Sequence, residues 1–298
     1  MRRPTPLNWF VILAVLAVGL ALGLPPDPHA IHQLHTTATS FRLAIAALLI
    51  PYILIWYAAF YAFGKLVEYA RHLKGTKDGE GFYKMTLGMG VLAFSLVVPA
   101  IVSLTLHRIA VHNPAFRPEA TIIANYVNIF PGVAAFLLLL NGARALLRTA
   151  PGAAQRFDLR WHTAWFLLLA VVFSHLTIEN QYQSNPYHLS LWILIVTIIV
   201  PYLYGWAVGL MSAYDLNVYS KAVRGSLYRR AIKQFANGIA VAILGSIAIQ
   251  FTNITIGQRI DKSLSAVLLA DYMLLIIIAA GLALMALGTK KLKQIEEI

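Results

Sequence analysis

Residues 51–58 read PYILIWYA, and residues 201–208 read PYLYGWAV. Each stretch places a proline inside an apolar run that is otherwise typical of one long helix. A proline removes one backbone hydrogen bond and clashes with the preceding turn, so these positions predict kinks. Three residue types recur in register between the two stretches, as Pro51 and Pro201, Tyr52 and Tyr202, Trp56 and Trp206. The recurrence predicts an internal duplication.

The composition is that of a membrane protein. Hydrophobic residues make up 59% of the 298 residues and charged residues only 12%, with a mean hydropathy of +0.69. Lipid cannot satisfy backbone N–H and C=O groups, and the apolar segments lack the two-residue alternation of barrel strands, so we expect helices. Eight segments approach the length of roughly 20 residues that a span needs. They are Leu7–Leu24, Phe41–Phe63, Thr86–Leu106, Ala120–Leu140, Trp161–Thr177, Leu189–Ala213, Ile232–Phe251 and Leu264–Leu287.

The net charge of +12 is distributed as a topology signal. With eight spans and a cytoplasmic N-terminus, most lysines and arginines fall on the cytoplasmic side, which is the positive-inside distribution. We therefore expect an integral, multi-pass protein with both termini in the cytoplasm, in the plasma (inner) membrane if the source is bacterial. The lipid bilayer is the partner that this charge favours, and nucleic acid is excluded. The absence of cysteine excludes disulfides, thiolate metal sites and iron–sulfur clusters.

The duplication extends beyond the two quoted stretches. Residues 41–75 align with residues 191–225 without a gap, and a two-residue shift then pairs Gly90 with Gly238. Proline, tryptophan and glycine match by chance less readily than leucine and isoleucine. Duplication therefore explains the alignment better than convergence of two similar helical hairpins does.

Each copy holds four of the expected helices. An even number of spans returns the chain to the side where it began, so both copies cross the membrane with the same orientation and form parallel repeats. We therefore expect an all-α, polytopic fold of eight transmembrane helices. It consists of two parallel four-helix repeats, residues 1–150 and residues 151–298.

One carboxylate is predicted to lie inside the membrane. Asp271 follows several apolar residues of the last segment, where an ionisable group needs a partner, water or a proton. Asn125 is its counterpart in the first copy, and Asn128 follows one turn later, so amide groups could face the same interior. The pattern predicts a proton or cation site. The alternative is a carboxyl that stays neutral or hydrogen-bonded to a neighbouring helix.

Four prolines fall inside apolar segments, namely Pro51, Pro99, Pro131 and Pro201. Each would free a carbonyl about four residues earlier in its helix. In transporters such carbonyls line substrate sites, so Pro51 and Pro201 could flank one, with Tyr52 and Tyr202 beside the kinks. Kinks that serve packing alone are the alternative interpretation.

Histidines gather on the side predicted to be outside. The candidate metal ligands are His29, His32, His35, His107, His175 and Glu179. The first three are spaced three residues apart, so in a helix their neutral imidazoles would converge on a divalent metal. A haem held between His107 and His175 is a second cofactor hypothesis. Against both, the spacing matches no defined metal motif, and interfacial histidines are common as amphipathic anchors.

Three functional classes fit these features. A transporter or channel-like protein, coupled to protons or cations and acting on a small ion or small molecule, accounts for duplicated kinked helices and a membrane carboxylate together. A membrane redox or metal-binding enzyme would use the outer histidines, and is less favoured. A non-catalytic subunit or sensor would dock a cytoplasmic or membrane partner through its basic loops.

Overall fold

The computed structural model describes residues 5–22, 38–113, 116–150, 200–257 and 264–296. Within these residues all regular structure is helical and no strand occurs, which confirms the all-α prediction for this part of the chain. The helices are α1 (Pro6–Leu22), α3 (Ala38–His72), α4 (Gly79–His112), α5 (Arg117–Thr149), α8 (Val200–Ala222), α9 (Ser226–Gly257) and α10 (Leu264–Glu296). The expected span Trp161–Thr177 and the first part of Leu189–Ala213 lie outside the described residues.

Five of the described helices are long and apolar enough to cross a membrane. The spanning stretches are Ala46–His72, Gly79–Leu106, Tyr126–Thr149, Ser226–Ile249 and Tyr272–Gln294. Because several helices qualify, the chain fits an integral, multi-pass membrane protein, as the composition predicts. The helices are longer than the spans expected from sequence, with 35 residues in α3 and 34 in α4. Their ends therefore extend beyond the hydrocarbon layer, which about 20 helical residues suffice to cross.

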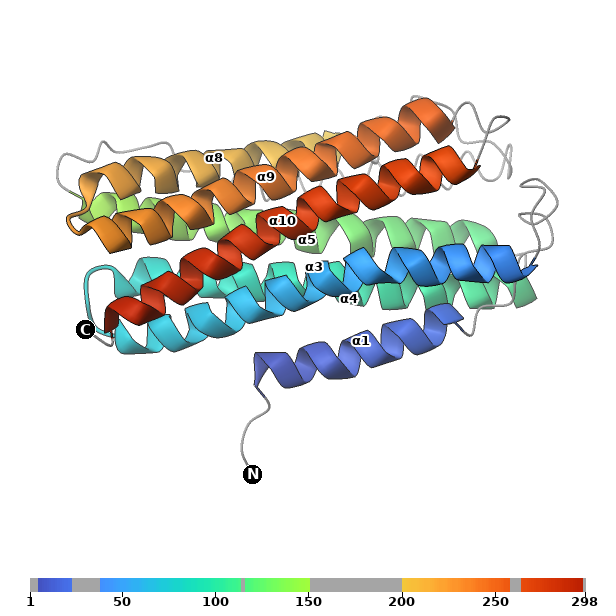
Figure 1. Cartoon of the computed structure of the whole chain (residues 1–298), viewed down its shortest axis with the longest axis horizontal. Helices are drawn as coiled ribbons and strands as arrows, with labels where there is room; N and C mark the ends of the chain where they lie inside the picture. Colours follow the sequence, from blue (N-terminus) through green and yellow to red (C-terminus); the bar gives the residue numbers. More distant parts are fainter. Residues whose placement is uncertain (1–4, 23–37, 114–115, 151–199, 258–263, 297–298) are drawn as a thin grey trace.

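The bundle contains two closely packed helix pairs. α4 packs against α5, and α9 packs against α10. α3 contacts both α4 and α10, and α8 contacts both α5 and α9, so these two helices join the pairs (Figure 1). α1 lies at the edge, against α3 and α4. An added Cβ at Gly142 would lie 2.7 Å from the Met85 backbone nitrogen, and one at Gly281 would lie 2.5 Å from the Ala242 backbone nitrogen. These crossings therefore require glycine, as close membrane helix contacts commonly do.

Short turns join α3 to α4 and α8 to α9. Gly75 and Gly225 occupy them with φ angles of 89° and 96°, a left-handed conformation that glycine adopts without steric cost. Both turns lie at the end of the bundle where α5 and α10 also finish (Figure 1). We call this end, which holds Gly75, Gly225 and Thr149, the turn end.

The prolines lie within the membrane helices. Pro51, Pro99 and Pro131 each lie inside a helix that continues on both sides, in α3, α4 and α5 respectively. Pro201 is the second residue of the described part of α8. Pro51 and Pro201 are both buried. The kinks expected at these four positions remain a prediction.

Candidate binding site

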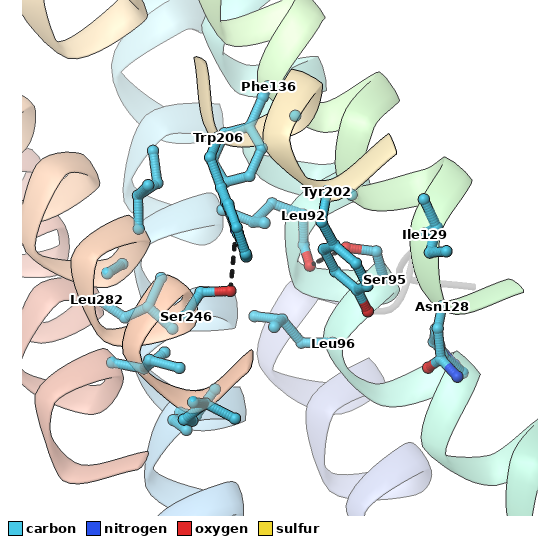
Figure 2. A pocket seen from close by; sticks show the side chains of 18 of the residues that line it. Leu92, Ser95, Leu96, Asn128, Ile129, Phe136, Tyr202, Trp206, Ser246 and Leu282 are labelled. Carbon is cyan, nitrogen blue, oxygen red and sulfur yellow. Dashed lines mark hydrogen bonds between the residues drawn. The ribbon is translucent and has the colours of Figure 1, made fainter. Parts of the chain in front are cut away.

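A cavity of about 430 Å³ lies inside the bundle, lined by residues of α3, α4, α5, α8, α9 and α10. Figure 2 shows part of its lining at close range. Its volume falls within the range of pockets that hold small molecules, roughly 300–1,000 Å³. Because every helix of the bundle except α1 contributes, the cavity depends on how the two closely packed pairs are joined.

Two aromatic pairs contribute to the lining, one from α3 and one from α8. The rings of Tyr52 and Trp56 have centroids 6.0 Å apart with an interplanar angle of 39°. The rings of Tyr202 and Trp206 are stacked, with centroids 5.6 Å apart and an angle of 29°. Each pair occupies the positions that the two quoted stretches share. The cavity therefore has a matching aromatic element on α3 and on α8.

Hydrogen bonds fix both indole rings. Trp56 Nε1 donates to the Leu96 backbone oxygen at 2.9 Å, from α3 to α4. Trp206 Nε1 donates to Ser246 Oγ at 3.1 Å, from α8 to α9 (Figure 2). An indole has a single N–H donor, and each is used in these bonds. The part of each tryptophan that a ligand could contact is therefore its π face and ring edge.

The polar groups of the cavity are hydroxyls and one amide. Ser95 Oγ donates to the Leu92 backbone oxygen of its own helix at 2.8 Å. Asn128 Nδ2 and Ser103 Oγ are 3.4 Å apart, a long hydrogen bond between α5 and α4. The Tyr202 hydroxyl has no hydrogen-bond partner among the described residues. These groups can both donate and accept, so the cavity suits uncharged polar atoms.

No Asp, Glu, Lys, Arg or His side chain is found among the described residues that line the cavity. Most of the lining is aliphatic or aromatic, with Leu92, Ile243, Leu282 and Met285 among the apolar residues. An ion in such surroundings loses its hydration without gaining an opposite charge. The described lining therefore favours a neutral occupant.

The charged side chains inside the bundle gather nearer the turn end. Arg144 Nε of α5 lies 3.5 Å from Asp215 Oδ2 of α8, and the two side chains are only 11% and 1% exposed. A buried ion pair gains little net energy because both partners lose hydration. Removing one partner is costly, however, so this pair specifies how α5 and α8 meet.

Asp78 joins three helices at the turn end. Its Oδ1 accepts a hydrogen bond of 2.6 Å from Thr149 Oγ1, and its Oδ2 accepts one of 3.0 Å from the Tyr219 hydroxyl. The Tyr219 and Tyr228 hydroxyls are 3.1 Å apart. Since Tyr219 donates its one proton to Asp78, Tyr228 must donate to Tyr219. Burial raises the pKa of Tyr219 above its ordinary value, so it keeps the proton that this network needs.

A second group of charges links α3 to α10. Glu68 Oε2 lies 2.9 Å from Lys293 Nζ and 3.0 Å from Lys65 Nζ. These side chains are more exposed than those of Arg144 and Asp215. Polar contacts thus connect both helix interfaces, α5 with α8 and α3 with α10, near the turn end.

The structure brings together some of the residues that the sequence pointed to. Tyr52, Tyr202, Asn128 and Pro99 line the cavity. Asn125 lies in α5 and Asp271 in α10, but their side chains are outside the described part. The proposed ion site at these two positions therefore remains a prediction.

The histidine hypotheses fall mostly outside the described residues. His29, His32, His35, His175 and Glu179 all lie there, and the side chain of His107 in α4 is not described either. Among the described residues no group of three or more His, Cys, Asp or Glu side chains could hold a metal ion. The metal and haem sites remain predictions.

Sequence reasoning missed the buried pair Arg144 and Asp215. The expected span Leu189–Ala213 ends before Asp215, and the expected span Ala120–Leu140 ends before Arg144, so both residues lie outside the predicted membrane segments. A usable signal was present, because Leu216 and Tyr219 continue the helical spacing of buried residues past Ala213.

Comparison with known proteins gives no match: no family model, no curated protein and no solved structure matches this chain. Similarity therefore assigns no function. The cavity and the contacts between the helices carry the functional inference.

Proposed function

We propose that this protein is a membrane transporter whose substrate occupies the cavity between two halves of the chain. The first half is residues 1–150 and the second is residues 151–298, each a parallel repeat of four helices. The observation that carries the proposal is the cavity itself, a small-molecule chamber lined by spanning helices from both halves. Transporters built from repeats commonly bind substrate near mid-membrane at the interface between repeats.

Repeated hydrogen bonds support the duplication. The two tryptophans donate to acceptors 40 residues further along the chain, on the next helix in each case. Position 96 therefore corresponds to 246 as position 56 corresponds to 206. The acceptor is a backbone oxygen at Leu96 and a hydroxyl at Ser246, so the geometry is repeated with different chemistry.

Helix crossings support the same alignment. A Cβ added at Gly142 would meet the backbone of residues 81 and 85, and one at Gly288 would meet the backbone of residues 231 and 235. α4 therefore aligns with α9 at the same offset as α3 with α8. On this basis Gly238 corresponds to Gly88 rather than to Gly90, and the two-residue shift is not needed. Gly88 and Gly238 each make a close backbone contact with the following long helix.

Rocking of one half against the other would move the substrate. The polar contacts near the turn end include Arg144 with Asp215, Asp78 with Tyr219 and Glu68 with Lys293, and each joins one half to the other. We propose that these contacts keep the turn end closed in this state and that they break when the cavity opens there. We propose that this end faces the cytoplasm, with both termini on the same side, because its turns carry basic residues as the positive-inside rule expects.

Coupling to a proton or cation remains part of the proposal. Position 271 is one helical turn from Leu275, and position 125 is one turn from Ile129, and both of those residues line the cavity. Asp271 and Asn125 would then hold the coupling ion beyond the cavity, on the side away from the turn end. A redox or metal protein and a non-catalytic sensor are the alternatives, but no contact among the described residues favours either.

The absence of cysteine makes a direct test available. Ser246→Cys places a thiol on the cavity wall, and a membrane-impermeant methanethiosulfonate reagent is added to right-side-out and to inside-out vesicles. Labelling of this thiol in both kinds of vesicle supports alternating access, because the cavity must then open to each side of the membrane. Labelling from one side alone, or from neither, would overturn the transport proposal.

Two control variants complete this experiment. Leu244→Cys lies on the same helix at a side chain 57% exposed on the bundle surface, and we expect lipid to protect it from the reagent. Thr76→Cys lies in the exposed turn beside Gly75 and reports which vesicles present the turn end.

A further inference from the structure

We infer that the cavity binds a neutral small molecule with a planar ring and a hydroxyl or carbonyl group. This inference names the ligand class, and it rests on the proposed function only for the claim that the ligand is also the transported substrate. Three independent features of the lining support it, namely its charge, its aromatic geometry and its hydroxyl groups.

The charge of the lining selects against ions. The described lining offers no Asp, Glu, Lys, Arg or His side chain. The buried charges of Arg144 and Asp215 lie opposite each other in an ion pair and are not part of the described lining. A carboxylate or ammonium ligand would lose its hydration without compensation. We therefore expect a neutral ligand to bind at least tenfold more tightly than an ionised ligand with the same ring system.

The aromatic geometry favours a planar ring. Tyr52 with Trp56 and Tyr202 with Trp206 present two sets of aromatic surface from α3 and α8. The hydrogen bonds of both indoles fix the ring planes before any ligand enters. Offset-stacked and edge-to-face contacts with a flat ligand would then cost little side-chain ordering.

The hydroxyls provide a small number of polar contacts. Ser246 Oγ accepts a hydrogen bond from Trp206 Nε1, so the hydroxyl hydrogen of Ser246 can point toward the cavity. The Tyr202 hydroxyl, without a partner among the described residues, is seen in Figure 2 on the same side of the cavity as Ser95. One hydroxyl or carbonyl on the ligand could therefore bond to Tyr202 or Ser246 while its ring meets the aromatic residues.

A lipid acyl chain is the competing occupant. An acyl chain would fill the apolar volume, but it would use neither the fixed ring planes nor the hydroxyls. The two occupants are separated by whether affinity depends on the Tyr202 hydroxyl and on a planar ring.

The test measures binding to the purified full-length protein by equilibrium dialysis and by quenching of tryptophan fluorescence. The probes are 1-naphthol, its ring without the hydroxyl (naphthalene), the same ring with a carboxylate (1-naphthoate), and decane. We expect saturable binding of 1-naphthol, with a Kd at least tenfold below that of 1-naphthoate. Tyr202→Phe should weaken 1-naphthol binding at least threefold and leave naphthalene binding unchanged.

Control variants and opposing outcomes are defined by the same probes. Tyr83→Phe, at a side chain 59% exposed outside the cavity lining, should bind all four probes as the unmodified protein does. If 1-naphthoate binds as tightly as 1-naphthol, the inferred neutrality is overturned. If decane binds as tightly as naphthalene and Tyr202→Phe changes nothing, the cavity is a lipid chamber and the inferred ligand class is overturned.

The ligand class and the transport proposal can fail separately. Expected naphthol binding together with one-sided labelling of Ser246→Cys would support the ligand class and overturn transport. Two-sided labelling of Ser246→Cys together with no binding of 1-naphthol would support transport and overturn the ligand class.

Discussion

The ion pair between Arg144 and Asp215 predicts a specific pattern of stability. Charges 3.5 Å apart attract by about 5 kcal/mol at an effective dielectric constant of about 20. Removing each charge from water costs several kcal/mol, so the intact pair contributes little net stability. Asp215→Leu would leave the Arg144 guanidinium buried without this carboxylate. We expect the free energy of unfolding to fall by about 3–5 kcal/mol.

The assay is a double-mutant cycle in mild detergent. Arg144→Met, Asp215→Leu and the double variant are unfolded by titration with dodecyl sulfate, and helicity is followed by circular dichroism. We expect the double variant to recover at least about 2 kcal/mol relative to the sum of the singles, because two apolar side chains replace the ions. The same cycle at Glu68 and Lys293, whose side chains are 42% and 37% exposed, should give a coupling below about 1 kcal/mol.

Small effects of the single variants would contradict the reasoning from burial. Single variants within about 1 kcal/mol of the unmodified protein, with a coupling no larger than at Glu68 and Lys293, would mean that the pair is hydrated like a surface contact. The reasoning from burial would then be refuted.

Three further predictions test the packing and the turn end by the same unfolding assay. Gly281→Ala puts a Cβ 2.5 Å from a backbone nitrogen and should cost about 1–3 kcal/mol, whereas Gly132→Ala, with no atom within 4 Å, should be neutral or gain up to about 1 kcal/mol. Gly75→Ala must hold a φ of 89° and should cost about 1–2 kcal/mol, while Gly75→Asn should cost less. Tyr219→Phe removes a donor to Asp78 and should cost about 1–2 kcal/mol, with faster hydrogen exchange at the turn end as a second readout. Equal stability of the Gly281 and Gly132 variants, or no effect at Gly75 or Tyr219, would contradict the corresponding contact.

The helical class and part of the site could be predicted from the sequence. Hydrophobic content and segment length determine the class, because lipid permits few alternatives for the backbone. The repeated PY stretches draw attention to Tyr52 and Tyr202, and both residues line the cavity, while their part in transport remains a prediction. A proline and its neighbours in a spanning helix thus help to locate the cavity, even though they do not identify its ligand.

Other features depend on contacts that a sequence does not reveal. Under the proposed duplication, the stretch LGMG offers both Gly88 and Gly90 as counterparts of Gly238, and the close backbone contact made by Gly88 and by Gly238 favours the first. Arg144 and Asp215 come from distant parts of the chain, and neither residue type indicates by itself that its side chain is buried. The hydrogen bond from Trp206 to the Ser246 hydroxyl could not be predicted from the hydrogen bond of Trp56, because Trp56 donates to a backbone oxygen.

Distance measurement between spin labels tests the central claim, which is that the two halves move against each other around the cavity. Labels on Lys77→Cys and Lys221→Cys, both exposed at the turn end, report on opposite halves, and Lys77→Cys with Arg148→Cys serves as the control within one half. We predict two distance populations for the first pair, with a ratio that changes when 1-naphthol is added, and one unchanged population for the control. A single, unchanged distance in both pairs would contradict the proposed movement.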